Sequence, residues 1–190
     1  AYAALGGTVT ASELFDAATS DFRTNITKLK TAMSTTGALV TVNAANTAQT
    51  MLQQISNLGW NKPIYSDYNT VQNPVIQDKK LANGIVFVDW NYQSEPNNSD
   101  TPNVKAYKQA YLEQFGTNPS LPAAAYYDGV KLALDAIKIV GESPQEVGNY
   151  ISNLTDYPLI TGKAKSFDSD CQAQREYQIR KVENGLFVSI

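Results

Sequence analysis

The chain has 190 residues, of which 43% are hydrophobic, and a formal net charge of −3. This apolar content is enough for a buried core, and its spaced clusters of Leu, Ile and Val exclude a disordered or low-complexity chain. The basic residues are scattered, so no nucleic-acid partner is expected. No apolar stretch approaches the ~20 residues that a membrane-spanning helix needs.

Two features of the composition argue against an enzyme. The chain has no histidine, which excludes Ser-His-Asp and Cys-His chemistry and histidine-based metal sites. Its one cysteine, Cys171, lies in a polar, acidic run that disfavours a thiolate. A phosphate-binding glycine loop and a nucleophile with its base are also missing. An enzyme on a doubly wound fold is therefore the least favoured hypothesis, and no metal or cofactor is expected.

Strands and helices alternate over the first 90 residues. Short apolar runs predict strands over residues 9–15, 38–42, 63–65 and 85–88. Apolar residues at helical spacing predict helices over 22–33 and 48–58, with Asp21 as an N-cap and Gly59 as a stop. An irregular segment separates the last two strands. This alternation predicts an α/β fold, with a parallel sheet covered by crossover helices.

The second half of the chain is mainly helical. A polar connector over residues 91–100 precedes predicted helices over 101–115 and 122–140 and a third that opens with a capping box at 143–146. Strands are predicted over 163–167 and 177–182, and Asn184 and Gly185 predict a hairpin turn. The three helices have apolar stripes but no sheet in their own segment. Either they pack on one another, or they cover a sheet formed upstream.

Several short stretches of the chain carry a family resemblance. They are Leu5-Gly6-Gly7-Thr8-Val9, Leu58-Gly59-Trp60, Ala82-Asn83-Gly84-Ile85, the more specific Ala125-Tyr126-Tyr127-Asp128-Gly129-Val130-Lys131-Leu132-Ala133, and the closing Thr161-Gly162 and Val182-Glu183-Asn184-Gly185. In this order they resemble the type I periplasmic binding proteins, the leucine/isoleucine/valine-binding group and its receptor relatives. The resemblance covers nearly the whole chain.

The resemblance implies two Rossmann-like lobes, joined by three crossovers, that close on a ligand. Residues 1–90 and 163–190 would form lobe II, and residues 91–162 would be helices of lobe I, whose sheet lies in an N-terminal half missing from this chain. It also implies an extracytoplasmic component of an ABC importer, periplasmic or lipid-anchored, that partners the transporter permease. The implied ligand is an amino acid, most simply branched-chain, or a similar small polar molecule. The alternative is a ligand-sensing receptor domain of the same fold.

In open α/β sheets, ligands contact the loops that follow the carboxyl ends of the strands. The first such loop holds Asn43, Ala44, Ala45 and Asn46, and the helix that follows offers free amides to a ligand carboxylate. The family often places an aromatic or small polar residue here, so the two alanines depart from its pattern. The alternative for the two asparagines is capping of that helix.

The second loop holds Asp67 and Tyr68. The resemblance implies an acid here that pairs with the ammonium group of an amino acid, and Asp67 is the nearest match. Tyr68 would stack on the ligand or donate a hydrogen bond. Trp90, after the next strand, and Tyr126, at the start of its helix, are further candidates. The alternatives are a turn cap for Asp67, surface packing for Tyr68, and burial at the hinge or in the core for the other two.

Overall fold

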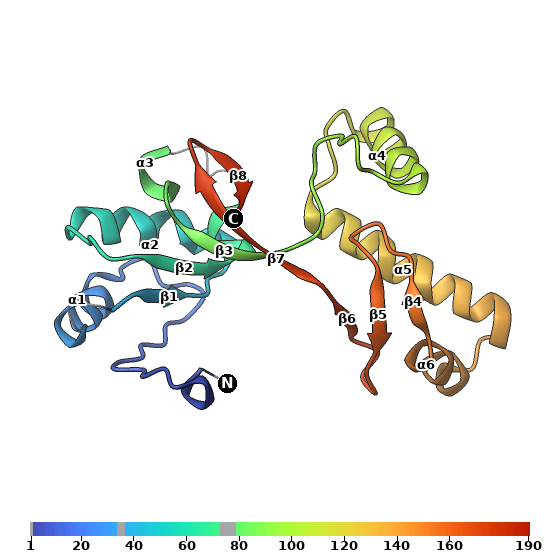
Figure 1. Cartoon of the computed structure of the whole chain (residues 1–190), viewed down its shortest axis with the longest axis horizontal. Coiled ribbons are helices and arrows are strands. Elements are labelled where there is room, and N and C mark those ends of the chain that lie inside the picture. The colour runs from blue at the N-terminus through green and yellow to red at the C-terminus, as the bar shows by residue number, and fades with distance from the viewer. Residues whose placement is uncertain (1, 34–36, 73–78) are drawn as a thin grey trace. The chain divides into compact units, whose positions relative to one another are not determined.

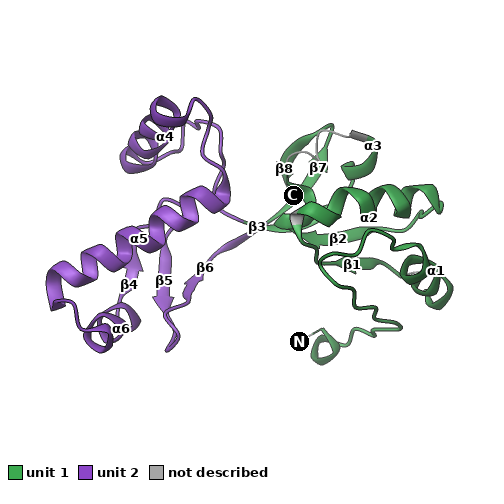
Figure 2. Ribbon diagram, turned by 180° about the vertical axis from the view of Figure 1, so that it is seen from behind, with its two compact units in different colours: residues 1–89, 179–190 green, residues 90–178 purple. Residues whose placement is uncertain are grey.

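The computed structural model describes residues 2–33, 37–72 and 79–190 and divides the chain into two compact units (Figures 1 and 2). The first unit contains residues 1–89 and 179–190, and the second contains residues 90–178. The chain therefore passes from one unit to the other twice, within strand β3 (Val86–Trp90) and within strand β7 (Tyr177–Glu183).

The first unit is built on a five-stranded sheet in the order β1-β2-β3-β7-β8. Its remaining elements are η1 (Ala3–Leu5), α1 (Arg23–Ala32), β1 (Leu39–Thr41), α2 (Ala45–Asn57), β2 (Ile64–Asp67), η2 (Tyr68–Val71), α3 (Lys79–Ala82) and β8 (Leu186–Ser189). Strands β1, β2 and β3 pair in parallel, with Leu39 opposite Ile64 and Tyr65 opposite Val86. The α/β fold with a parallel sheet is therefore confirmed.

The C-terminal hairpin forms as its turn residues predict. Strands β7 and β8 pair antiparallel, with Glu183 opposite Leu186. Between them Asn184 and Gly185 have φ angles of 53° and 80°. A two-residue turn with both φ angles positive matches the right-handed twist of the strands that it joins, which is why Asn-Gly is favoured there.

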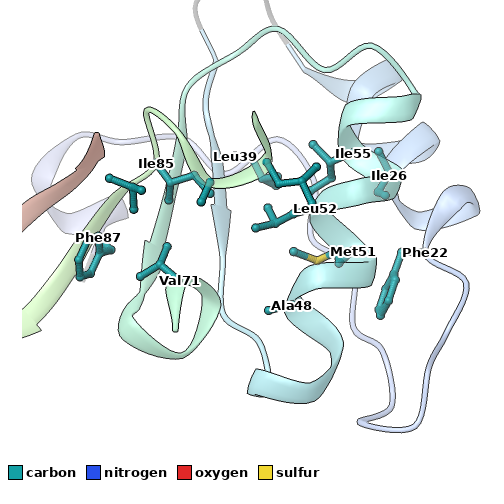
Figure 3. Packing of buried hydrophobic residues seen from close by; sticks show 13 residues of the cluster. Phe22, Ile26, Leu39, Ala48, Met51, Leu52, Ile55, Val71, Ile85 and Phe87 are labelled. Atoms are coloured by element: carbon teal, nitrogen blue, oxygen red, sulfur yellow. The ribbon is translucent and has the colours of Figure 1, made fainter. Parts of the chain in front are cut away.

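Helices α1 and α2 cover one face of this sheet with the apolar residues that the helical spacing predicts. The core cluster combines Phe22 and Ile26 with the α2 residues Ala48, Met51, Leu52 and Ile55 and with Leu39, Val71, Ile85, Phe87 and Val182 (Figure 3). Gly59 follows α2 with a φ of 66°, a conformation that glycine adopts without strain. The N-cap position of α1 is Phe22 rather than the predicted Asp21, but the Asp21 carboxylate accepts a hydrogen bond from the first helical amide, that of Arg23, at 3.1 Å and also pairs with the Arg23 guanidinium at 2.6 Å.

The predicted strand over residues 9–15 is wrong. These residues form neither strand nor helix, and Val9 and Leu14 are 66% and 93% exposed. Phe15 is the exception, since its ring packs edge-on against Phe22 at 5.0 Å. A short apolar run becomes a strand only where a neighbouring strand accepts its hydrogen bonds. Between β2 and β3 the predicted irregular segment contains η2 and α3, and its residues 73–78 lie outside the described residues.

The second unit combines three helices with a small sheet. Its elements are α4 (Pro102–Phe115), α5 (Leu121–Val140), α6 (Pro144–Ser152), β4 (Thr155–Tyr157), β5 (Ala164–Phe167) and β6 (Ala173–Arg175), and the strands pair antiparallel in the order β4-β5-β6. Each of the three helices has a proline at its first or second position, as predicted for α4 and α6. The Ser143 side chain, however, forms no cap hydrogen bond, so the predicted capping box is absent.

Residues 163–178 lie in the second unit, whereas the family resemblance groups them with residues 1–90. Ala164 and Phe167 of β5 pack in one cluster with Leu132 and Ala136 of α5 and Ile151 of α6. This packing holds β5 and its neighbours in the second unit, so part of the helical segment covers a sheet of its own. Strands β4 and β6 escape prediction because each has three residues and little apolar content.

Helix α5 is apolar on two faces. Tyr127, Val130, Leu134 and Ile137 recur at helical spacing along α5; the first three are 43%, 61% and 52% exposed within this unit, and Ile137 is half-buried. The buried face instead carries Leu132 and Ala136. Periodicity cannot choose between two apolar faces of one helix, and a helix with both faces apolar is typical of one placed between two layers.

A buried ion pair fixes the start of α4. The Lys108 ammonium, 4% exposed, contacts the Asp100 carboxylate and the Glu95 carbonyl oxygen, both at 2.8 Å. Burial alone would raise the pKa of Asp100, but the hydrogen bonds from Lys108 and from the Asn97 amide prevail and lower it. A carboxyl whose folded pKa is lowered stabilises the fold above its unfolded pKa of about 3.9 and loses that contribution as pH falls through the folded pKa.

We therefore predict that the second unit loses stability on acidification through Asp100. Asp100→Asn should lower the free energy of unfolding at pH 7, and this deficit should shrink as the pH falls from about 5 to about 2. Urea denaturation at a series of pH values measures both, with the exposed Asp170→Asn as the matched control. A deficit that is unchanged at the lowest pH would contradict this assignment.

Candidate functional site

The carboxyl ends of β1, β2 and β3 lie at one edge of the first unit's sheet, because the three strands run parallel and in register. The loop with Asn43 and Ala44 follows β1, Asp67 ends β2 and Asp89 lies near the end of β3 (Figure 1). Polar residues from segments 20 or more positions apart along the sequence therefore meet at this edge. We call it the carboxyl edge.

Asn43 is buried at the carboxyl edge, with 4% of its surface exposed. Its Nδ2 donates to Thr41 Oγ1 at 2.8 Å and to Thr70 Oγ1 at 3.3 Å. Its Oδ1 is buried without a partner among the described residues. Asn43 does not cap α2, whose N-cap is Ala44, so the capping alternative is wrong for this residue.

Among the residues that the structure describes, no side chain caps the N-terminus of α2. The amides of Thr47 and Ala48 both donate to the Ala44 carbonyl, at 3.0 and 3.3 Å. Ala44 is exposed, and Asn46 is exposed in the first turn. The side chain of Ala45 lies outside the described part of the structure. A helix that begins without a capping side chain presents its first amides and the positive end of its dipole to an anion.

Asp67 ends β2 and caps η2. Its Oδ1 accepts hydrogen bonds from the Thr70 amide at 3.2 Å and the Thr70 hydroxyl at 2.7 Å. Asp67 Oδ1 therefore caps a turn, which was the alternative to ligand contact for this residue. Both bonds reach Oδ1, so the cap occupies one oxygen of the carboxylate, and a carboxylate has acceptor capacity on both.

Tyr68 lies beside a buried ion pair that no sequence motif indicates. Arg180 of β7 contacts Asp89 of β3 at 3.2 Å, with side chains 3% and 2% exposed. Tyr68 packs edge-on against Phe187 at 6.1 Å. Burial first, and then the Asp89 charge, raises the pKa of Tyr68, while Arg180 acts against them. The buried side chains of β7 are those of Arg180 and Val182, and no sequence pattern singles out Arg180 as buried.

Trp90 and Tyr126 belong to the second unit, whereas the other candidates belong to the first. The Trp90 ring is half-buried beneath the Arg175 guanidinium, at 4.3 Å from the ring centroid. Arg175 also donates to Thr161 Oγ1 at 2.6 Å. Tyr126 is 78% exposed on α5, so the alternative that places it in the core is wrong.

The most specific family-like stretch, residues 125–133, contains an aspartate with a structural role. Asp128 is 5% exposed and accepts hydrogen bonds from the Ile160 amide at 2.6 Å, the Thr161 amide at 2.9 Å and the Thr161 hydroxyl at 2.6 Å. These bonds attach α5 to the loop that precedes β5. Three donors satisfy a carboxylate that would otherwise be costly to bury.

In open α/β sheets, ligands bind at the carboxyl ends of the strands, and here that edge carries an acid and a helix start without a side-chain cap among the described residues. The family comparison agrees: residues 1–186 match the family described as periplasmic binding protein, and the chain belongs to that family. The type I fold expected from the sequence is thereby confirmed. The proteins of this family and the structural neighbours are binding proteins rather than enzymes.

Three solved structures illustrate the similarity of this chain to proteins with the same fold. A leucine binding protein, LivK, from Thermotoga maritima aligns with 93% of this chain at 18% identity and a TM-score of 0.76. LivJ from Streptococcus pneumoniae, a branched-chain amino acid transporter substrate binding protein in complex with isoleucine, aligns with 91% at 25% identity and a TM-score of 0.70. An extracellular ligand-binding receptor from Rhodopseudomonas palustris aligns with 99% at 17% identity and a TM-score of 0.82.

The chain spans about half the length of these relatives, since the alignments cover 49%, 48% and 56% of them. Among curated proteins, none is similar in sequence. Within residues 2–33, 37–72 and 79–190, no helix has the length and apolarity required to cross a membrane.

We predict that the buried ion pair is essential to the stability of the carboxyl edge. Arg180→Met removes the cation that faces Asp89 and should lower the free energy of unfolding of the first unit by about 3–5 kcal/mol. Arg23→Met, which breaks the exposed pair with Asp21, should cost far less, because solvent screens that pair. Chemical denaturation compares the two, and equal costs would contradict a dominant role for the buried pair.

Proposed function

We propose that this chain carries ligand-contacting loops of an extracytoplasmic solute-binding protein that serves an ABC importer, and that its ligand is an amino acid of the branched-chain type. The observation that carries the proposal is that the Asp67 carboxylate and the N-terminus of α2, which no described side chain caps, lie at the same edge of the sheet. An amino acid is a zwitterion, so it needs one anion and one anion-binding site. The relatives described as leucine binding and isoleucine-bound support the same class.

In the proposed binding mode, the ammonium group of the amino acid contacts the Asp67 carboxylate, and its carboxylate accepts from the first amides of α2. Ala44 and Ala45 supply no polar side-chain group, so recognition in this loop falls to the backbone. Asn43 and Asn46 flank that contact, and Tyr68 adds an aromatic surface or a hydroxyl donor. Trp90 and Tyr126 remain proposed contacts from the second unit.

The transporter named in the description of the Streptococcus relative supports the proposed importer role, and the proposed partner is the permease of an ABC transporter. The proposed location is the periplasm or, with a lipid anchor, the cell surface. The proposed mechanism is hinge closure. A ligand that binds the closed state more tightly than the open state shifts the equilibrium toward the closed state by that difference in affinity. A ligand-sensing receptor domain is the second candidate, favoured by the description of the Rhodopseudomonas relative.

We also propose that the two units contribute to two lobes whose remaining layers lie outside this chain. The observation that supports this is an apolar sheet face that is exposed among the described residues of the first unit, where Val40, Tyr65 and Val86 stand opposite one another on β1, β2 and β3. Val40 is 73% exposed and Tyr65 is 44% exposed. Parallel sheets are almost always covered on both faces. The outward apolar stripe of α5 supports the same proposal for the second unit.

For the ligand, we predict that the full-length gene product binds L-isoleucine or L-leucine and that Asp67→Asn weakens binding by about tenfold or more, since hydrogen bonds to charged groups contribute about 1.5–3 kcal/mol. Asparagine retains an Oδ1 acceptor for the Thr70 cap, so the fold should be preserved. Titration calorimetry measures the affinity, with exposed Asp16→Asn as the control. No binding of any amino acid by the wild type would contradict the proposed ligand class.

For the lobes, we predict that Val40→Asp has different consequences in the isolated chain and in the full-length gene product. In the chain alone, an exposed substitution should change stability by no more than about 0.5 kcal/mol, whereas beneath a covering layer it should cost about 1–3 kcal/mol. Denaturation of both, with Val9→Asp as the matched control, decides the matter. Small effects in both backgrounds would show that the face is not covered.

A further inference from the structure

The loops that follow β1 and β2 are joined by a continuous row of buried hydrogen bonds. Asn43 Nδ2 donates to Thr41 Oγ1 at 2.8 Å and to Thr70 Oγ1 at 3.3 Å. Thr70 Oγ1 in turn donates to Asp67 Oδ1 at 2.7 Å, and the Thr70 amide donates to the same oxygen at 3.2 Å. Thr70 is fully buried. The row therefore runs from the end of β1 to the carboxylate that ends β2.

The direction of each bond in this row is fixed by the donors available. A threonine hydroxyl has one proton, and here it goes to the Asp67 carboxylate, which accepts only. The Thr70 oxygen must then receive a hydrogen from its other neighbour, so Asn43 has to present its NH₂ group rather than its carbonyl oxygen. The two hydrogens of that NH₂ group serve Thr41 and Thr70. Asn43 thus orients the Thr70 hydroxyl toward Asp67.

The result is an aspartate held by one of its two oxygens. Two donors from a single buried residue fix Oδ1, which restricts rotation of the carboxylate about its side-chain bonds. The second oxygen takes no part in this row. A charged group that is held in place before binding loses less entropy when the ligand arrives.

We propose that Thr70, oriented by Asn43, is a positioning residue that sets the Asp67 carboxylate for the ammonium group of the ligand. This inference rests on the proposed function, since it requires an amino-acid ligand at the carboxyl edge. Thr70 itself does not touch the ligand. Its effect is therefore confined to the part of the ligand that Asp67 recognises.

The test compares two ligands that differ only in the group that Asp67 would bind. L-Isoleucine carries the ammonium, and the corresponding 2-hydroxy acid has a hydroxyl in its place. Thr70→Val removes the hydroxyl with little change in size and should weaken L-isoleucine binding by about three- to tenfold, the loss of one net hydrogen bond. Binding of the hydroxy acid should change by less than about twofold. Thr70→Ser retains the hydroxyl and should restore wild-type affinity for L-isoleucine.

Asn43→Ala examines the same row from its other end and keeps the inference testable if Thr70→Val does not fold. It should also weaken L-isoleucine binding more than hydroxy-acid binding. Equal losses for the two ligands, or none, in variants of a wild-type protein that binds L-isoleucine would overturn the positioning role alone. A full-length wild type that binds neither L-isoleucine nor the hydroxy acid would overturn the proposed function and this inference with it.

Discussion

The parallel pairing of β1, β2 and β3 is the constraint from which the candidate site follows. Parallel strands bring their carboxyl ends to one edge, and each strand is then continued by a loop that must lead away from the sheet. In this chain those loops carry Asn43 and Asp67, and the start of α2 has no capping side chain. Because α2 also supplies much of the hydrophobic core, the same packing that stabilises the first unit fixes the direction of the helix's free amides.

Buried polar groups define where this fold is specific rather than merely compact. Three such groups lose hydration on folding and are matched by partners from another segment. They are the Asp89–Arg180 pair, the Lys108–Asp100 pair, and Asp128, which accepts three hydrogen bonds. Such groups add little net stability compared with apolar residues, but removal of one partner is costly. They therefore disfavour alternative packings of the chain. The row from Asn43 to Asp67 belongs with them, and it differs in that it ends at the candidate ligand contact.

The sequence predicts the fold where a single signal dominates. The apolar faces of α1 and α2, the short strands of the parallel sheet and the Asn184-Gly185 turn all agree with the structure because local spacing and burial point the same way. It fails where tertiary contacts decide. Leu14 lies in a predicted strand but belongs to no strand in the part of the chain that the structure describes, α5 has two apolar faces, and β4 and β6 are too short to show a period. At the site, loop positions were predictable, whereas Thr70, Asp89 and Arg180 were not, because their importance lies in neighbours distant in sequence.

Mapping a bound ligand onto the backbone would show whether the carboxyl edge of the first unit receives an amino acid. Amide chemical shifts of the isotope-labelled full-length protein would be followed by NMR during titration with L-isoleucine. We predict the largest changes at Asn43 to Asn46 and at Asp67 to Thr70, with little change at the exposed residues Gln49 and Gln53 on α2. Changes confined to other surfaces would contradict this prediction, as would saturable binding that leaves both of these loops unaffected.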